Sequence, residues 1–125
     1  MSNHIRKNYE ELANFLRIIS HPVRLAILDI LFAKQEECVC HLDAILGFRQ
    51  AYLSQHLMCL REAGIVIDRR KGRHIFYRIT DNNLIKLLEV AKELSGQGAN
   101  QMFFESVEPS CPEWEQNSKQ KRIKN

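Results

Sequence analysis

Hydrophobic residues recur along this chain at the three- and four-residue spacings of amphipathic helices, and two short β-branched runs interrupt the pattern. Leu53, Leu57 and Leu60 show the helical spacing most clearly. The pattern predicts about five helices, over residues 9–19, 22–32, a short segment ending at Leu46, 50–63 and 82–94. The expected fold class is therefore mainly α with a small β component (α+β).

The centre of the chain combines a helix with a two-stranded hairpin. Ala63-Gly64 ends the helix, because glycine readily adopts the left-handed conformation found at helix ends. Ile65–Ile67 and Ile75–Ile79 are β-branched runs of the kind found in strands, and Lys71-Gly72 between them predicts a tight turn. Two short helices joined through Gly47 are typical of a helix-turn-helix. Together these elements predict a winged helix-turn-helix with the hairpin as its wing.

Positive charge is concentrated on this unit. From Arg49 to Arg78 there are seven basic residues and two acidic ones, whereas the net charge of the whole chain is only +3. A recognition helix presents polar side chains to base edges, and wing cations contact phosphates. His56 is also expected to pack and hydrogen-bond behind the helix, and His74 to accompany the basic wing. The predicted DNA-contacting residues are Arg49, Gln50, Ser54, Gln55, His56, Arg69, Arg70, Lys71 and Arg73.

The length of 125 residues allows one modest core. The compact DNA-binding and dimerisation domain is expected over residues 1–98, with a flexible C-terminal tail over 99–125. Apolar positions along 82–94 exceed what this core needs, so we expect a homodimer formed through the first and last helices. No apolar run approaches the roughly 20 residues that span a bilayer, and no signal-peptide pattern is present, which predicts a cytoplasmic protein with no membrane partner.

The sharpest chemical feature is the pair Cys38-Val39-Cys40, in a chain with four cysteines. In a reducing compartment these residues should be thiols, and soft thiolates favour thiophilic ions. Residues two apart in a regular helix point about 200° from one another. Both sulfurs can therefore hold one ion only where the backbone is irregular or where binding distorts it, which would strain the recognition helix that follows. Alternatively, the two cysteines are simply small buried side chains.

The segments SHPVRLAIL, ECVCHL and LSQHLMCLREAGIV, in this order and spacing, resemble the ArsR/SmtB family of winged-helix repressors over roughly residues 9–95. The resemblance implies a homodimer that sits on operator DNA and releases it when an inducer binds. ECVCHL lines up with the family's ELCVCDL metal box, with Glu37 and His41 as departures. Another zinc site of the family, on the last helix, is not expected here, because Asn83 stands where a histidine is needed.

The resemblance also implies which ligands and inducers to expect. Cys38 and Cys40 would bind As(III), Cd(II), Pb(II) or Zn(II) as the inducer, with no permanent cofactor. A third ligand is needed, and Cys111 is the first choice, because an isolated cysteine in a polar tail has little reason to be there for packing. His41 is the second choice, and Cys59 is an alternative because some members take a ligand from the recognition helix.

Two other functions stay open from the sequence. The same fold could act as a repressor that senses oxidants through its thiols without a metal, although the acidic pair Glu36-Glu37 disfavours a reactive Cys38. An enzyme with a cysteine nucleophile is not expected, because Cys40 and His41 are chain neighbours whose side chains diverge and no acid completes the set.

Overall fold

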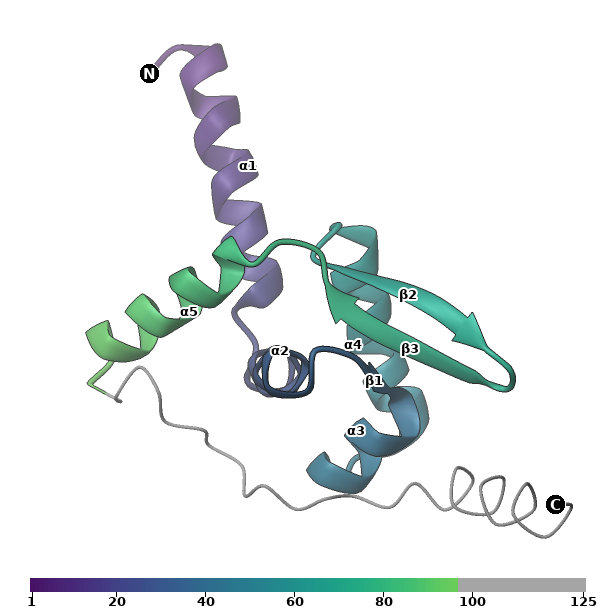
Figure 1. The fold of residues 1–125 in the computed structure, drawn as a ribbon. Coiled ribbons are helices and arrows are strands. Elements are labelled where there is room, and N and C mark those ends of the chain that lie inside the picture. The colour runs from purple at the N-terminus through teal and green to yellow at the C-terminus, as the bar shows by residue number, and fades with distance from the viewer. Residues whose placement is uncertain (97–125) are drawn as a thin grey trace, which may run out of the picture.

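The computed structural model describes residues 1–96, which form five helices and one three-stranded antiparallel sheet (Figure 1). No helix in this part of the chain is both long and apolar enough to cross a membrane. The elements are α1 Asn3–Ile19, α2 Pro22–Lys34, β1 Glu37–Cys38, α3 Val39–Leu46, α4 Gln50–Glu62, β2 Val66–Lys71, β3 His74–Ile79 and α5 Asn83–Leu94. The predicted winged helix-turn-helix is confirmed, with α3 and α4 as the helix pair and β2–β3 as the wing.

The sheet has the strand order β1-β3-β2, so β3 lies between the wing strand β2 and the short strand β1. β2 pairs with β3 from Val66 opposite Ile79 to Lys71 opposite His74. The turn that joins them is Gly72-Arg73, one residue later than predicted, and Gly72 has φ +63°. A positive φ at the first central residue suits glycine and matches the twist of a hairpin.

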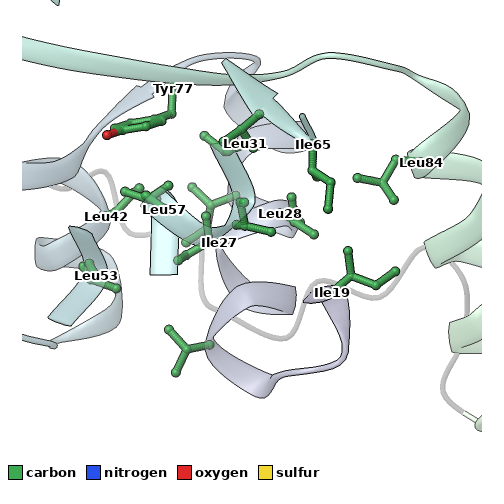
Figure 2. Close-up of a cluster of buried hydrophobic side chains, with 14 of the residues drawn as sticks. Ile19, Ile27, Leu28, Leu31, Leu42, Leu53, Leu57, Ile65, Tyr77 and Leu84 are labelled. Atoms are coloured by element: carbon green, nitrogen blue, oxygen red, sulfur yellow. The ribbon is translucent and has the colours of Figure 1, made fainter. Parts of the chain in front are cut away.

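The core lies where α2, α3 and α4 meet beneath the sheet. Figure 2 shows Ile27, Leu28 and Leu31 of α2 close to Leu57 of α4, with Tyr77 of β3 above them. All of these side chains are buried. The predicted apolar positions of the recognition helix, Leu53, Leu57 and Leu60, are fully buried as well, which fixes the face that α4 turns outward.

Two helix starts differ from the predicted ones. The α1 helix begins at Asn3 rather than near Tyr9, because the Ser2 hydroxyl caps it by accepting a hydrogen bond from the amide of Ile5. The α5 helix begins one residue after the predicted start, with the carboxylate of Asp81 accepting from the amide of Asn83. Serine and aspartate both satisfy amides left open in a first helical turn.

The outer faces of α1 and α5 carry a row of large apolar side chains that this chain leaves exposed. Figure 1 shows α1 extending away from the rest of the molecule, with α5 leaving the body near the C-terminal half of α1. Only Leu84 and Leu88 of α5 are buried. The exposed apolar residues of the two helices are Ile5, Tyr9, Leu12, Leu16, Leu87, Val90 and Leu94.

Candidate functional site

The first turns of α4 present polar side chains to solvent. Arg49 is its N-cap residue and, like Gln50 and Gln55, is exposed, while Ser54 is half-buried. Tyr52 lies on the same stretch and packs its ring against Phe48, with the ring centroids 5.3 Å apart. These residues form an accessible polar surface at the start of the recognition helix, as the sequence predicts.

His56 does not share that surface, because it is buried against the helix that precedes the helix-turn-helix. Its Nδ1 accepts a hydrogen bond from Nε of Arg24 at 3.0 Å, and its ring centroid lies 4.5 Å from that of His21. Burial lowers the pKa of His56, and the charges of His21 and Arg24 lower it further. The expected packing role is the one observed, and His56 is removed from the set of side chains that can face DNA.

The basic residues of the wing fall into two groups. Arg69 donates to Glu36 and its guanidinium lies 5.2 Å from the centre of the Phe76 ring, so its charge is partly neutralised within the chain. This pairing was not expected, since the two residues are 33 positions apart. Among the described residues, no ion pair involves Arg70, Lys71 or Arg73, and all three are exposed at the end of the hairpin.

The cysteine pair lies where strand β1 gives way to helix α3. Cys38 ends β1 and is the N-cap of α3, with an extended backbone (φ −88°, ψ 160°), whereas Cys40 belongs to the first turn of the helix. The two sulfurs are 2.7 Å apart. The backbone irregularity that a shared ion requires is therefore built into the fold, because the two residues belong to different kinds of secondary structure.

The surroundings of Cys38 disfavour its thiolate. The residue is buried, and this burial raises the pKa of its thiol, with the adjacent carboxylate of Glu37 adding to the effect. Glu37 is itself buried and contacts Nδ1 of His41 at 2.5 Å. An ion that binds Cys38 must therefore displace the thiol proton, because the thiolate is the form that binds a metal.

Comparisons with known proteins connect this fold to a family. The family model "Bacterial regulatory protein, arsR family" matches residues 21–68. The Biofilm growth-associated repressor of Agrobacterium fabrum is 42% identical over 85 residues, which are 68% of this chain and 72% of that protein. The chain belongs to the arsR family. It is thus a winged-helix transcriptional repressor of the ArsR/SmtB type, and DNA is its partner, as predicted from the sequence.

Solved structures of similar proteins agree with this assignment. NolR from Sinorhizobium fredii superimposes with a TM-score of 0.70 at 35% identity, covering 78% of this chain and 97% of NolR. The AntR antimony-specific transcriptional repressor superimposes with a TM-score of 0.63 at 27% identity, covering 70% of this chain and 79% of AntR. AntR and the Agrobacterium fabrum relative are both repressors, which is a non-enzymatic role.

The fold brings some of the predicted metal ligands together and leaves others apart. Within residues 1–96, two groups of three potential ligands have their atoms within 4.8 Å of one another. One is Glu37, Cys38 and His41, and the other is Cys38, Cys40 and His74. Cys59 belongs to neither group, and Cys111 lies outside the described residues.

His74 is the residue that sequence reasoning missed as a potential ligand. It opens β3, 34 positions after Cys40, and was expected only to accompany the basic wing. The missing signal was strand β1, because a two-residue strand has no recognisable hydrophobic period. Once β1 is paired with β3, Glu37 lies opposite Tyr77 and Cys38 opposite Phe76, so the same register extended by two residues brings Cys40 to His74.

The oxidation state of the cysteines also bears on the site. Cys38 and Cys59 are free thiols, whereas Cys40 is disulfide-bonded. The reduced protein is therefore the form in which the Cys38 and Cys40 sulfurs are both available to an ion.

Proposed function

We propose that this repressor releases its operator DNA when a thiophilic metal or metalloid ion binds the thiolates of Cys38 and Cys40. The observation that carries the proposal is the 2.7 Å separation of the two sulfurs at the junction of a strand and a helix. Once Cys40 is reduced, two neighbouring thiolates at this corner would suit soft ions such as Cd(II), Pb(II), Zn(II) and As(III). The antimony-specific relative AntR supports a metalloid or heavy-metal inducer for this chain as well.

The position of the pair suggests how ion binding would reach the DNA-contacting helix. Two sulfurs bound to one tetrahedral zinc at about 2.3 Å are roughly 3.8 Å apart. The Cys38 and Cys40 sulfurs would have to separate by about 1 Å from their present 2.7 Å. Because Cys38 is fixed in the sheet, the strain falls on the first turn of α3, which packs against α4. A small shift of α3 would change how Gln50 and Gln55 meet the DNA.

The proposal also includes a third ligand for the ion and a homodimeric assembly. Cys111 is proposed as a third thiolate, which would suit a three-sulfur site for As(III). The protein is proposed to act as a homodimer in which the exposed apolar faces of α1 and α5 cover one another. In support, seven large apolar side chains on these two helices are at least 39% exposed. Burying apolar surface stabilises an association by about 25 cal/mol per Å².

The test is a DNA-release titration with the reduced full-length protein. A duplex selected by the protein from a random-sequence pool serves as the operator, and arsenite or Cd(II) is added while fluorescence anisotropy reports DNA binding. We expect the ion to weaken DNA binding by about 5- to 150-fold, the usual range for coupled sites. A sulfur-to-metal absorption band should rise with the same stoichiometry.

Two variants make the result specific. The double variant Cys38→Ser/Cys40→Ser should bind DNA as wild type does and should no longer respond to the ion. Cys59→Ser is the matched control, because Cys59 is a free thiol outside both ligand groups, and its response should be unchanged. A double variant that still releases DNA normally would refute the proposal.

A thiol redox switch on the same fold is the second candidate, favoured by the disulfide bond at Cys40. In that case oxidation with diamide, in the presence of a chelator, would release DNA, and a thiol reductant would restore binding. No stoichiometric sulfur-to-metal band would appear on adding the ions. The buried Cys38, with its raised pKa, is a poor nucleophile, which makes it the less suitable of the two cysteines for such chemistry.

A further inference from the structure

We propose that His74, the first residue of the wing strand β3, is a ligand of the ion bound by Cys38 and Cys40, and that the site takes a borderline divalent ion such as Zn(II) or Cd(II). This inference rests on the proposed function, and it adds a ligand and a route to the DNA. It places one ligand in the sheet, one in α3 and one in the wing itself.

The first support is the position of the imidazole. Its Nδ1 lies 4.0 Å from Sγ of Cys40, and ligand atoms of Cys38, Cys40 and His74 all lie within 4.8 Å of one another. In a tetrahedral zinc site with bonds of about 2.3 Å to sulfur and 2.0–2.1 Å to nitrogen, a sulfur and a nitrogen are roughly 3.6 Å apart. The present distance exceeds that value by about 0.4 Å, which side-chain rotation can close.

The second support is the lack of ordinary hydrogen bonds around this ring. Nε2 of His74 is buried and has no hydrogen-bond partner among the described residues. Within residues 1–96, the polar contact of Nδ1 is the long approach to the Cys40 sulfur. Sulfur is a weak hydrogen-bond partner, so this contact does little to hold the ring. An ion bound between Nδ1 and the two cysteine sulfurs would replace the long contact with a ligand bond.

His41 is the competing histidine, and its surroundings differ. Its Nδ1 already contacts the carboxylate of Glu37, four residues earlier in the chain, so this nitrogen has a strong polar partner without an ion. A ligand at His41 would also connect only β1 and α3, and would leave the wing untouched. His74 is therefore the better candidate on both hydrogen bonding and placement.

The chemistry of the three side chains selects the class of ion. Imidazole nitrogen suits Zn(II), Cu(II) and similar divalent ions, and thiolate sulfur suits soft ones, so a mixed set of two sulfurs and one nitrogen favours Zn(II) or Cd(II). An all-thiolate set would favour As(III) instead.

Binding at His74 would act directly on the part of the wing that meets DNA. His74 is paired with Lys71 across the hairpin, and only the Gly72-Arg73 turn separates these two residues. In Figure 1 the hairpin extends beyond α3 and β1, so an ion held at the start of β3 would tie its outer half to the body of the protein. Arg70, Lys71 and Arg73, which form no ion pair within residues 1–96, would be moved or held by that tether.

The test compares His74→Gln with His41→Gln in the reduced full-length protein. His41→Gln is the matched control, since it removes the other imidazole close to Cys38. Zn(II) affinity is measured by competition with a chromophoric chelator. We expect His74→Gln to weaken Zn(II) binding at least tenfold and His41→Gln to change it less than threefold. Circular dichroism and ion-free DNA binding confirm that both variants are folded.

A spectroscopic readout identifies the bonded atom. In protein labelled with ¹⁵N-histidine and loaded with ¹¹³Cd(II), a one-bond cadmium–nitrogen coupling should appear in wild type and in His41→Gln, and should be absent from His74→Gln. In the DNA-release assay, saturating Zn(II) should weaken DNA binding of His74→Gln much less than that of wild type.

The outcomes separate the two levels of the argument. If Cys38→Ser/Cys40→Ser abolishes ion binding while His74→Gln binds Zn(II) like wild type and wild type shows no cadmium–nitrogen coupling, the inference is overturned and the proposed function survives. Loss of the coupling in His41→Gln instead would assign the nitrogen ligand to His41 and also overturn it. A wild-type protein that binds neither Zn(II) nor Cd(II) would overturn this inference. If arsenite also fails to release DNA from that protein, the proposed function is rejected as well.

Discussion

Neutralising the tip of the wing should flatten the salt dependence of DNA binding. Arg70, Lys71 and Arg73 are exposed and make no ion pair with any described residue, so their charges are available to phosphates. Each neutralised phosphate contributes about 0.9 to the slope of log affinity against log salt concentration. Losing one phosphate contact therefore removes about 0.9 from the slope, which corresponds to roughly a 3.5-fold smaller loss of affinity between 50 and 200 mM salt, and each subunit that binds DNA contributes its own such change.

The assay measures the affinity for a selected duplex by fluorescence anisotropy at four or more salt concentrations. Arg73→Gln should lower the slope by about 0.9 per subunit, and the triple variant with Arg70→Gln and Lys71→Gln by about 2.7. Lys7→Gln is the control, because it removes the same charge from the exposed first half of α1, which Figure 1 shows far from the wing. If the triple variant has the slope of wild type, the wing does not contact phosphates and the DNA-binding surface has to be redrawn.

Three further outcomes are expected. Leu12→Glu, in the exposed apolar row of α1, should convert the protein to a monomer in sedimentation velocity. The control variant Asn14→Glu, on the opposite side of that helix, should leave the dimer intact. A dimer that tolerates Leu12→Glu would exclude this interface. Leu57→Ala should lower the free energy of unfolding, measured in urea, by about 2–5 kcal/mol, because Leu57 is fully buried. Met58→Ala should lower it by less than about 1 kcal/mol, because Met58 is half exposed. Similar losses in both variants would contradict the assigned packing. Burial lowers the pKa of His56, so just below the ordinary histidine pKa of about 6.5 the unfolded state binds more protons than the folded state. The free energy of unfolding should therefore fall as the pH drops from 7.5 to 5.5, and it should fall less in His56→Gln. Equal falls in the two proteins would argue against His56 as the cause.

The helices and the hairpin could be predicted from the sequence because each carries its own local signal. Leu53, Leu57 and Leu60 set the buried face of α4. The helix ends at Glu62, just before the predicted Ala63-Gly64 stop, and Gly64 has φ +75°, which favours glycine. The β-branched runs likewise become the two strands of the wing. Arrangements that depend on residues far apart in the chain were not accessible in this way.

The candidate site shows both sides of this limit. The sequence identifies Cys38 and Cys40 as a pair and states that a shared ion needs an irregular backbone. It does not disclose that β1 supplies this irregularity, because Glu37 and Cys38 become a strand only through pairing with Tyr77 and Phe76. The approach of His74 to Cys40 follows from the same pairing.

The charge of the wing gives a second example. A count of basic residues places Arg69 with Arg70, Lys71 and Arg73, since all four are close in sequence. In the fold Arg69 contacts Glu36, which precedes β1 and lies beside the wing only because the sheet brings them together. The cations available to DNA are therefore fewer than the sequence suggests, and they are concentrated beyond this ion pair, at the end of the hairpin.

The corner between β1 and α3 is an effective place for a regulatory site on purely geometric grounds. β1 is hydrogen-bonded to β3 of the wing, and α3 packs against α4, so one corner touches both elements that carry the predicted DNA contacts. A displacement of about 1 Å there, as ion binding to both sulfurs would need, is passed on through a strand ladder and a helix contact, both of which are stiff because interiors are close-packed. A site on α5 would have to act through the arrangement of two subunits instead. The position of Cys38 and Cys40 therefore favours regulation within one chain, so that a monomeric Leu12→Glu variant should still lose DNA affinity when the ion binds.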